Sequence, residues 1–269
     1  MRKKRNIPGF KTTMAATTAW LAVLVLIPLS SIVFTSWPLS ASEFWKVVWN
    51  PRAIGAYKLT FGGALIAAAI NGVLGLLIAW VLARYKFFGR NFVNSLIDIP
   101  FALPTAVAGL AYSSLYSETG WMGRFLVPMG IHAVHTPLAV VLVLTFVSLP
   151  FVVRSLQPVF EELGTESEEA AQSLGATRWQ SFRHVIFPSV FPALLTGVAL
   201  AFSRAVGEYG SVVFVAGTRD TTIAPLLILY QLDDFNFGGA AAIALVLLIA
   251  SFLINGSINL LSRWARRHE

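Results

Sequence analysis

Two ionisable side chains lie inside a strongly apolar stretch of this sequence, and they are the first candidates for chemistry. Arg204 and Glu208 are four residues apart, a spacing that places both on one face of an α-helix. Ionisable groups at membrane depth are costly and usually face a partner or a water-filled path. We favour a local ion pair without net charge. The alternative, that Arg204 contacts an anion in transit, stays open.

A second set of candidates surrounds the prolines of an apolar stretch earlier in the chain. Pro100 and Pro104 free backbone groups, which a membrane tolerates only where neighbours or a cavity satisfy them. With Thr105 they form either a gate beside a solute pathway or an ordinary kink. Asp98, at the end of this stretch, is expected to be a boundary charge near Arg84 or Arg90. The predicted pathway residues are Pro104, Thr105, Ser203, Arg204 and Glu208.

Other kinds of chemistry find no support. The chain has no cysteine, which excludes thiolate metal sites and disulfides. His132 and His135 are three apart, but no acidic ligand stands close to them in sequence, so we expect no metal site. The sequence has no nucleophile–base set and no pair of catalytic carboxylates. It also lacks the glycine-rich loop that binds ATP phosphates. We therefore predict no enzyme and no cofactor bound by this chain.

The composition explains what must position these residues. Of 269 residues, 56% are hydrophobic and 12% are charged, against about 45–50% and about 25% in soluble domains. This composition nearly excludes a water-soluble enzyme and indicates an all-α bundle embedded in a membrane. The net charge of +7 then concerns orientation in the membrane before any contact with nucleic acid.

Apolar runs long enough to cross a bilayer predict six transmembrane helices. The first could instead be a cleaved signal peptide, but its apolar region of about 20 residues exceeds the usual 7–15. Small faces in the second, at Gly62, Gly63, Gly72 and Gly75, predict close helix packing. The six runs lie within 14–34, 58–84, 98–118, 124–154, 187–215 and 234–263.

Basic residues give the orientation. Six spans put both termini on one side, and that side receives 14 of the 20 Lys and Arg residues, against five on the other and Arg204 inside a span. The positive-inside rule then places both termini in the cytoplasm. The 14 are Arg2, Lys3, Lys4, Arg5, Lys11, Arg84, Lys86, Arg90, Arg154, Arg178, Arg183, Arg263, Arg266 and Arg267; the five are Lys46, Arg52, Lys58, Arg124 and Arg219.

The longest cytoplasmic loop, about 155–187, is the most polar part of the chain. Thr165 and Glu168 form one capping-box pattern, and Thr177 and Gln180 form another. Gly175 between them is suited to end a helix. We predict two short helices at the membrane surface. They are either a solvated connector or, because Ala170 and Ala171 permit close approach, a docking surface for another protein.

The spacing in this loop resembles a known family. Glu169-Ala170-Ala171, then Gly175 after three residues, Val185 after nine more, and Pro188 resembles the "EAA" loop of permease subunits of bacterial ABC importers. The resemblance implies that the loop couples the permease to a separate ATPase subunit. By the same resemblance, Glu169, Ala170, Ala171, Gly175 and Pro188 would form the coupling contact.

Further stretches narrow the resemblance. The segment 98–110 is similar to the third span of permeases of the sulfate/thiosulfate T-subunit group, as are 148–154 and 174–182. The segment 203–211 resembles the fifth span of the wider sulfate, molybdate and tungstate group. The resemblance covers roughly residues 5–265 and implies a type I importer permease with the MetI-like fold.

That family implies a role and a set of partners. The role is uptake of sulfate or thiosulfate across the bacterial inner membrane. The implied partners are a second homologous permease, an ATPase dimer that binds ATP and Mg²⁺, a periplasmic binding protein, and membrane lipid, with no nucleic acid. A molybdate or tungstate permease is a close alternative. An ion-coupled secondary transporter is a more distant one, although no internal repeat supports it.

The predicted organisation along the chain has four parts. A basic cytoplasmic tail covers 1–13, and the first transmembrane helix covers 14–36. The permease core covers 56–263 and includes the coupling loop 155–187. A short cytoplasmic tail, 264–269, ends the chain.

Overall fold

The computed structural model describes residues 9–217 and 221–265, and within these ranges it contains helices and no strands. The basic residues at 2–5, 219, 266 and 267 that entered the orientation argument lie outside the described residues. The helices are α1 (Phe10–Ser36), α2 (Ala41–Val48), α3 (Pro51–Arg84), α4 (Arg90–Ala102), α5 (Thr105–Tyr116), α6 (Gly123–Leu126), α7 (Pro137–Leu163), α8 (Glu166–Ser173), α9 (Arg178–Ser181), α10 (Phe187–Val206), α11 (Val212–Val215), α12 (Ala224–Asp233) and α13 (Phe237–Ala265).

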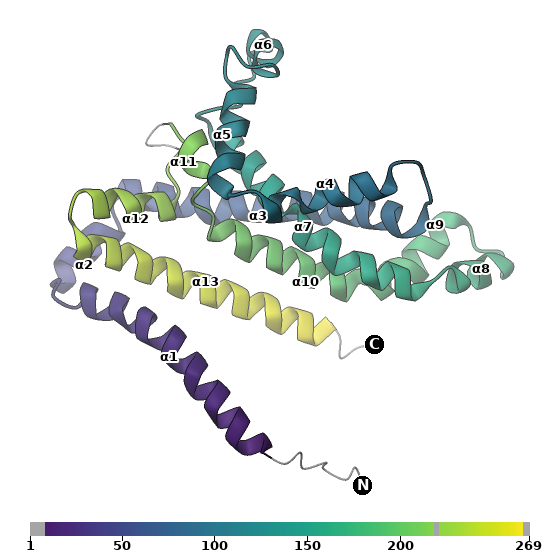
Figure 1. The fold of residues 1–269 in the computed structure, drawn as a ribbon, viewed down its shortest axis with the longest axis horizontal. Coiled ribbons are helices and arrows are strands. Elements are labelled where there is room, and N and C mark those ends of the chain that lie inside the picture. Colours follow the sequence, from purple (N-terminus) through teal and green to yellow (C-terminus); the bar gives the residue numbers. More distant parts are fainter. Residues whose placement is uncertain (1–8, 218–220, 266–269) are drawn as a thin grey trace.

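The long helices α3, α7, α10 and α13 run side by side along the long axis of the molecule (Figure 1). Helices α8 and α9 lie at one end of this bundle, and α2 and α12 lie at the other. From the α2 end of the bundle, α1 and α13 both extend toward the opposite side, so the described start of α1 and the described end of α13 point the same way (Figure 1). This arrangement agrees with an even number of crossings.

The core forms where α3, α7 and α10 approach one another closely. A Cβ added at Gly75 in α3 would lie 2.6 Å from Cγ1 of Val152 in α7. One added at Gly197 in α10 would lie 3.0 Å from the Val152 Cα. The predicted close packing of the α3 glycines is therefore confirmed at Gly75, whereas Gly62 faces open space.

The third predicted span is not a single kinked helix. Helices α4 and α5 meet at an angle of 111°. The break falls at Leu103 and Pro104, because a proline ring disfavours helical backbone at the residue before it. Helix α4 lies along the bundle, while α5 leaves it, with α6 beyond (Figure 1). Within residues 9–217 and 221–265, five helices are long and apolar enough to span a membrane, and the bent pair would make a sixth.

The fifth predicted span is shorter than its apolar run. Helix α10 ends at Val206, and residues 207–211 are irregular before the short helix α11 begins. Glu208 therefore lies after the helix rather than within it. The available signal for this end was the pair Gly207 and Gly210 on either side of Glu208, because glycine favours helix ends and turns.

Candidate functional site

Helix α8 ends as its glycine predicts. The Gly175 N–H donates to the Gln172 carbonyl at 2.9 Å, and the Ala176 N–H donates to the Ala171 carbonyl at 3.0 Å. This pair of bonds is the Schellman motif, which requires a left-handed residue, and Gly175 has φ +88°. The turn directs the chain from α8 into α9.

The capping box predicted at the start of α8 is absent. Thr165 precedes the helix, but its side chain makes no capping hydrogen bond, and its backbone is helical rather than extended. The Glu168 side chain instead reaches α3, where its Oε1 lies 2.8 Å from Nη2 of Arg84. The competing partner is an arginine 84 positions earlier in the chain, which local spacing cannot reveal.

The second predicted capping box is present. The Gln180 N–H donates to Oγ1 of Thr177 at 3.3 Å, and Oε1 of Gln180 accepts from the Thr177 N–H at 2.8 Å. After α9 a π-helical turn, Phe182–Ile186, leads into α10, where Pro188 occupies a first-turn position that needs no N–H donor. The Phe182 ring stacks on Trp80 of α3 with centroids 5.1 Å apart.

The side chains around the α8–α9 turn face outward. Glu169, Ala170 and Pro188 are exposed, and Ala171 is half-buried. Leu174 is 90% exposed, and Trp179 is also exposed. Apolar side chains presented beside carboxylates suit a protein partner better than water. Four of the five predicted coupling residues therefore lie on α8 and the turn that ends it, whereas Pro188 belongs to α10.

The predicted ion pair within the fifth apolar run is present. Nη1 of Arg204 lies 2.5 Å from Oε2 of Glu208. The other carboxylate oxygen of Glu208 accepts from the Ser211 N–H at 2.9 Å and from the Ser211 hydroxyl at 2.7 Å. Glu208 is 1% exposed, and the Arg204 side chain is 30% exposed. Burial of the carboxylate is thus balanced by an arginine and two donors.

The two groups of predicted pathway residues lie against each other. A Cβ added at Gly210 would clash with the Thr105 hydroxyl, and one added at Gly109 would clash with the Ser211 carbonyl. Helix α5 therefore packs directly on the segment that holds Glu208. Sequence reasoning did not single out Gly109 or Gly210, although both fall in the segments that carry the family resemblance.

The remaining two pathway candidates differ in their surroundings. Pro104 is exposed at the break between α4 and α5. Ser203 is half-buried, and its hydroxyl lies 2.5 Å from Oδ1 of Asn255 in α13. Ser203 therefore joins α10 to α13, away from the Thr105 contact.

Asp98 has a different partner from the one predicted. Arg154 of α7 donates from Nε to Oδ1 of Asp98 at 2.9 Å and from Nη2 to Oδ2 at 2.6 Å. Its other three donors reach Oδ1 and the carbonyl of Asn94 and Oε1 of Gln157. Arg84 and Arg90 instead face Glu168 and Glu161. Because all five donors of Arg154 are used, this residue fixes α4 against α7.

The sequence analysis did not predict a polar contact between α3 and α7. Asn71 lies fully buried in α3, and its Nδ2 donates to the Thr145 carbonyl and to the Ser148 hydroxyl of α7, each at 2.9 Å. Polar side chains of this kind hold membrane helices together. The available signal was a single asparagine within a long apolar run.

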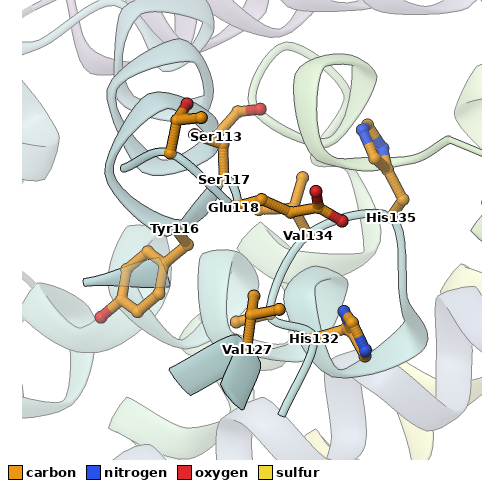
Figure 2. Close-up of a pocket in the computed structure, with 10 residues that line it drawn as sticks. Ser113, Tyr116, Ser117, Glu118, Val127, His132, Val134 and His135 are labelled. Carbon is orange, nitrogen blue, oxygen red and sulfur yellow. The ribbon is translucent and has the colours of Figure 1, made fainter. Parts of the chain in front are cut away.

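A pocket of about 380 Å³ lies at the C-terminal end of α5, and its lining residues fall within 113–119 and 127–135. Figure 2 shows Glu118 and Ser117 from the segment after α5 together with His132 and His135 from the segment before α7. Among the described residues, no group of three or more His, Asp or Glu side chains is arranged to hold a metal ion.

Comparison with known proteins supports the permease family that the sequence resembles. Residues 71–267 match the family model described as "Binding-protein-dependent transport system inner membrane component". The chain is 48% identical to the "Sulfate transport system permease protein CysT" of Salmonella typhimurium, over 98% of this chain and 96% of that protein. It is 46% identical to the protein of the same name from Escherichia coli, with the same coverage.

Solved structures agree on the fold. A crystal structure of a bacterial ABC transporter involved in the import of alginate matches with a TM-score of 0.78 at 14% identity, covering 94% of each chain. The MetNI methionine ABC transporter matches with a TM-score of 0.60 at 20% identity, covering 84% of this chain and 99% of that chain. By sequence over most of its length and by its helical fold, the chain belongs to the family of inner-membrane components of binding-protein-dependent transport systems.

Proposed function

We propose that this chain is a permease subunit of an ATP-driven importer and that it carries sulfate or thiosulfate across the bacterial inner membrane. One observation carries the choice of solute: the chain is 48% identical, over nearly its full length, to a protein named as a sulfate transport system permease. The same similarity favours sulfate over molybdate or tungstate. It also argues against an ion-coupled secondary transporter.

The α8–α9 surface supports a separate ATPase as partner. This chain has no phosphate-binding loop for ATP, so ATP and Mg²⁺ would be held by that partner. Glu169, Ala170 and Leu174 face outward on a turn that Gly175 fixes. An ATPase dimer would contact this surface and the matching surface of a second, homologous permease. A periplasmic binding protein would deliver the anion at the opposite end of the bundle.

In the proposed orientation, with α8 and α9 on the cytoplasmic side, both termini would also be cytoplasmic. This orientation agrees with the basic residues and with the course of α1 and α13, whose described chain ends both point away from the α2 end of the bundle (Figure 1). The solute would pass between this chain and the second permease, near Thr105 and the Arg204–Glu208 pair. In that position the pair would hold the pathway wall in place, because Glu208 neutralises Arg204 and removes the strong fixed cation that would trap a divalent anion.

The test is uptake of labelled sulfate by cells that lack this chain, with and without the chain restored. We expect restored uptake that excess unlabelled thiosulfate suppresses and excess molybdate barely affects. Suppression by molybdate instead would reassign the solute. Uptake that does not depend on the chain would contradict a role in sulfate import.

A further inference from the structure

Two neighbouring glutamates at the start of α8 face different surroundings. Glu169 is exposed, whereas Glu168 faces inward and its side chain is 20% exposed. Its partner, Arg84, is 10% exposed and belongs to the last turn of α3. The ion pair therefore connects the predicted coupling helix to a helix of the transmembrane core.

A second contact joins the same two parts of the molecule. Trp80 lies four residues before Arg84, so both side chains share one face of α3. The Trp80 ring stacks on Phe182 in the π-helical turn, at an interplanar angle of 13°. The last turn of α3 thus contacts the loop on both sides of α9. Helix α8 itself has no buried residue and packs mainly on the π-helical turn Phe182–Ile186 and on α9.

The Arg84 contact differs in kind from the Arg154 contact. Arg154 uses all five of its donors in aligned hydrogen bonds. In the described part of the chain, Nε and Nη2 of Arg84 and Oε1 of Glu168 are buried and make no aligned hydrogen bond. The 2.8 Å contact is therefore close but not directional. Such a pair keeps its attraction when the two groups rotate, whereas a forked hydrogen-bonded pair does not.

We infer that Arg84 and Glu168 form a pivoting joint that transmits the movement of the coupling helix to α3. This inference rests on the proposed function and adds to it the residues that carry the movement into the membrane. Glu169 on the outer face would hold the ATPase, and Glu168 on the inner face would pass its displacement to α3. Arg84 is a positioning residue in this scheme, because it touches neither solute nor nucleotide.

The experiment uses the complete transporter, with three variants of this chain. Arg84→Gln removes the charge, Arg84→Lys keeps it without the forked geometry, and Lys86→Gln is a matched control that removes an exposed positive charge two residues later. The measurements are labelled sulfate uptake, ATP hydrolysis per transporter, and the amount of ATPase that co-purifies with the permease.

For Arg84→Gln we expect uptake to fall by about tenfold or more, the scale of an ordinary coupling free energy. ATP hydrolysis and co-purified ATPase should stay close to the unmodified level. Arg84→Lys and Lys86→Gln should both transport normally. Normal uptake by Arg84→Gln would overturn the inference. Equal failure of Arg84→Lys would also overturn it, because a pivot needs only the charge.

A final variant covers loss of folding. If Arg84→Gln does not accumulate in the membrane, the exchanged pair Arg84→Glu with Glu168→Arg restores opposite charges at the same place. Uptake restored by this exchange would support the joint, and restored abundance without uptake would refute it. The unmodified chain, tested in the same strain, examines the proposed function separately. A loss confined to the variants therefore concerns only the joint.

Discussion

Arg154 and Asp98 form an ion pair with two hydrogen bonds that joins α7 to α4. The pair lies shortly before the end of α4, where the next helix, α5, begins at an angle of 111°. The three remaining donors of the arginine bind Asn94 and Gln157, so its planar head is held in one orientation. We expect this cluster to fix α4 while α5 leaves the bundle.

The first prediction concerns this cluster. Arg154→Lys keeps the charge but loses the fork, so we expect it to destabilise the permease by about 1–3 kcal/mol, the scale of hydrogen bonds to charged groups. Thermal unfolding of the purified transporter in detergent would measure the change. The control is Lys46→Gln in α2, an exposed charge at the other end of the bundle, which should change the free energy of unfolding by less than about 1 kcal/mol. Equal effects of the two variants would contradict the assigned role.

The second prediction concerns two glycines on α3. Gly75→Ala should destabilise the permease by about 1–3 kcal/mol, because the added carbon would meet the stiff Val152 side chain at 2.6 Å. Gly62→Ala on the same helix meets nothing within 4 Å and should be neutral or slightly stabilising. Pairing Gly75→Ala with Val152→Ala should recover part of the loss. The same unfolding assay applies, and an equal response of the two glycines would argue against close α3–α7 packing.

The third prediction separates the two interpretations of Arg204. Arg204→Gln leaves the buried Glu208 carboxylate without its partner. We expect this change to lower the free energy of unfolding of the permease by about 3 kcal/mol. Glu208→Gln leaves an arginine that is partly exposed, so its cost should be smaller. The double variant, with both changed to Gln, should recover much of the stability.

Sulfate uptake by that double variant decides between the interpretations. If the pair only holds the fifth span in place, uptake should return together with stability. If Arg204 contacts the anion, the stable double variant should still fail to transport. Arg204→Gln that unfolds no more easily than Glu208→Gln would show that the carboxylate does not depend on the arginine.

The fourth prediction concerns the turn after α8. Gly175→Ala places a side chain at φ +88° with no steric neighbour, so the whole cost is backbone strain of about 1–2 kcal/mol. Less ATPase should therefore co-purify with the permease. Gly175→Asn, which tolerates this backbone better, should lose less. If alanine and asparagine retain as much ATPase as glycine, the turn is not required for docking.

The sequence allowed the spans to be predicted because burial in lipid needs only length and apolar character. It also allowed the Thr177–Gln180 capping box and the Gly175 turn to be predicted, since each depends on residues within six positions. The two wrong predictions of polar contacts share one physical cause. Glu168 pairs with Arg84 instead of forming a capping box with Thr165. Asp98 pairs with Arg154 instead of the arginines that are nearer in the sequence. Distant partners decide such contacts.

The end of α10 was missed for a different reason. The prediction followed the length of the apolar run, whereas Gly207 and Gly210 mark the end of the helix at Val206 and place Glu208 in irregular chain. The prolines indicated a bend between α4 and α5, but the angle depends on the packing of Gly109 against Ser211. The Arg204–Glu208 pair was predictable because i,i+4 spacing also brings the residues together across a frayed helix end.

The exposed side chains of the α8–α9 turn have a consequence for the life of the protein in the cell. Leu174, at 90% exposure, and Trp179 are uncovered in the isolated chain, and under the proposed function the ATPase would cover them. A newly made copy without partners would expose this hydrophobic surface to chaperones and proteases, and such copies would be degraded. We therefore expect the amount of permease in the membrane to follow the supply of its ATPase. Excess copies would be degraded, which would keep the subunits in fixed proportion without matched rates of synthesis.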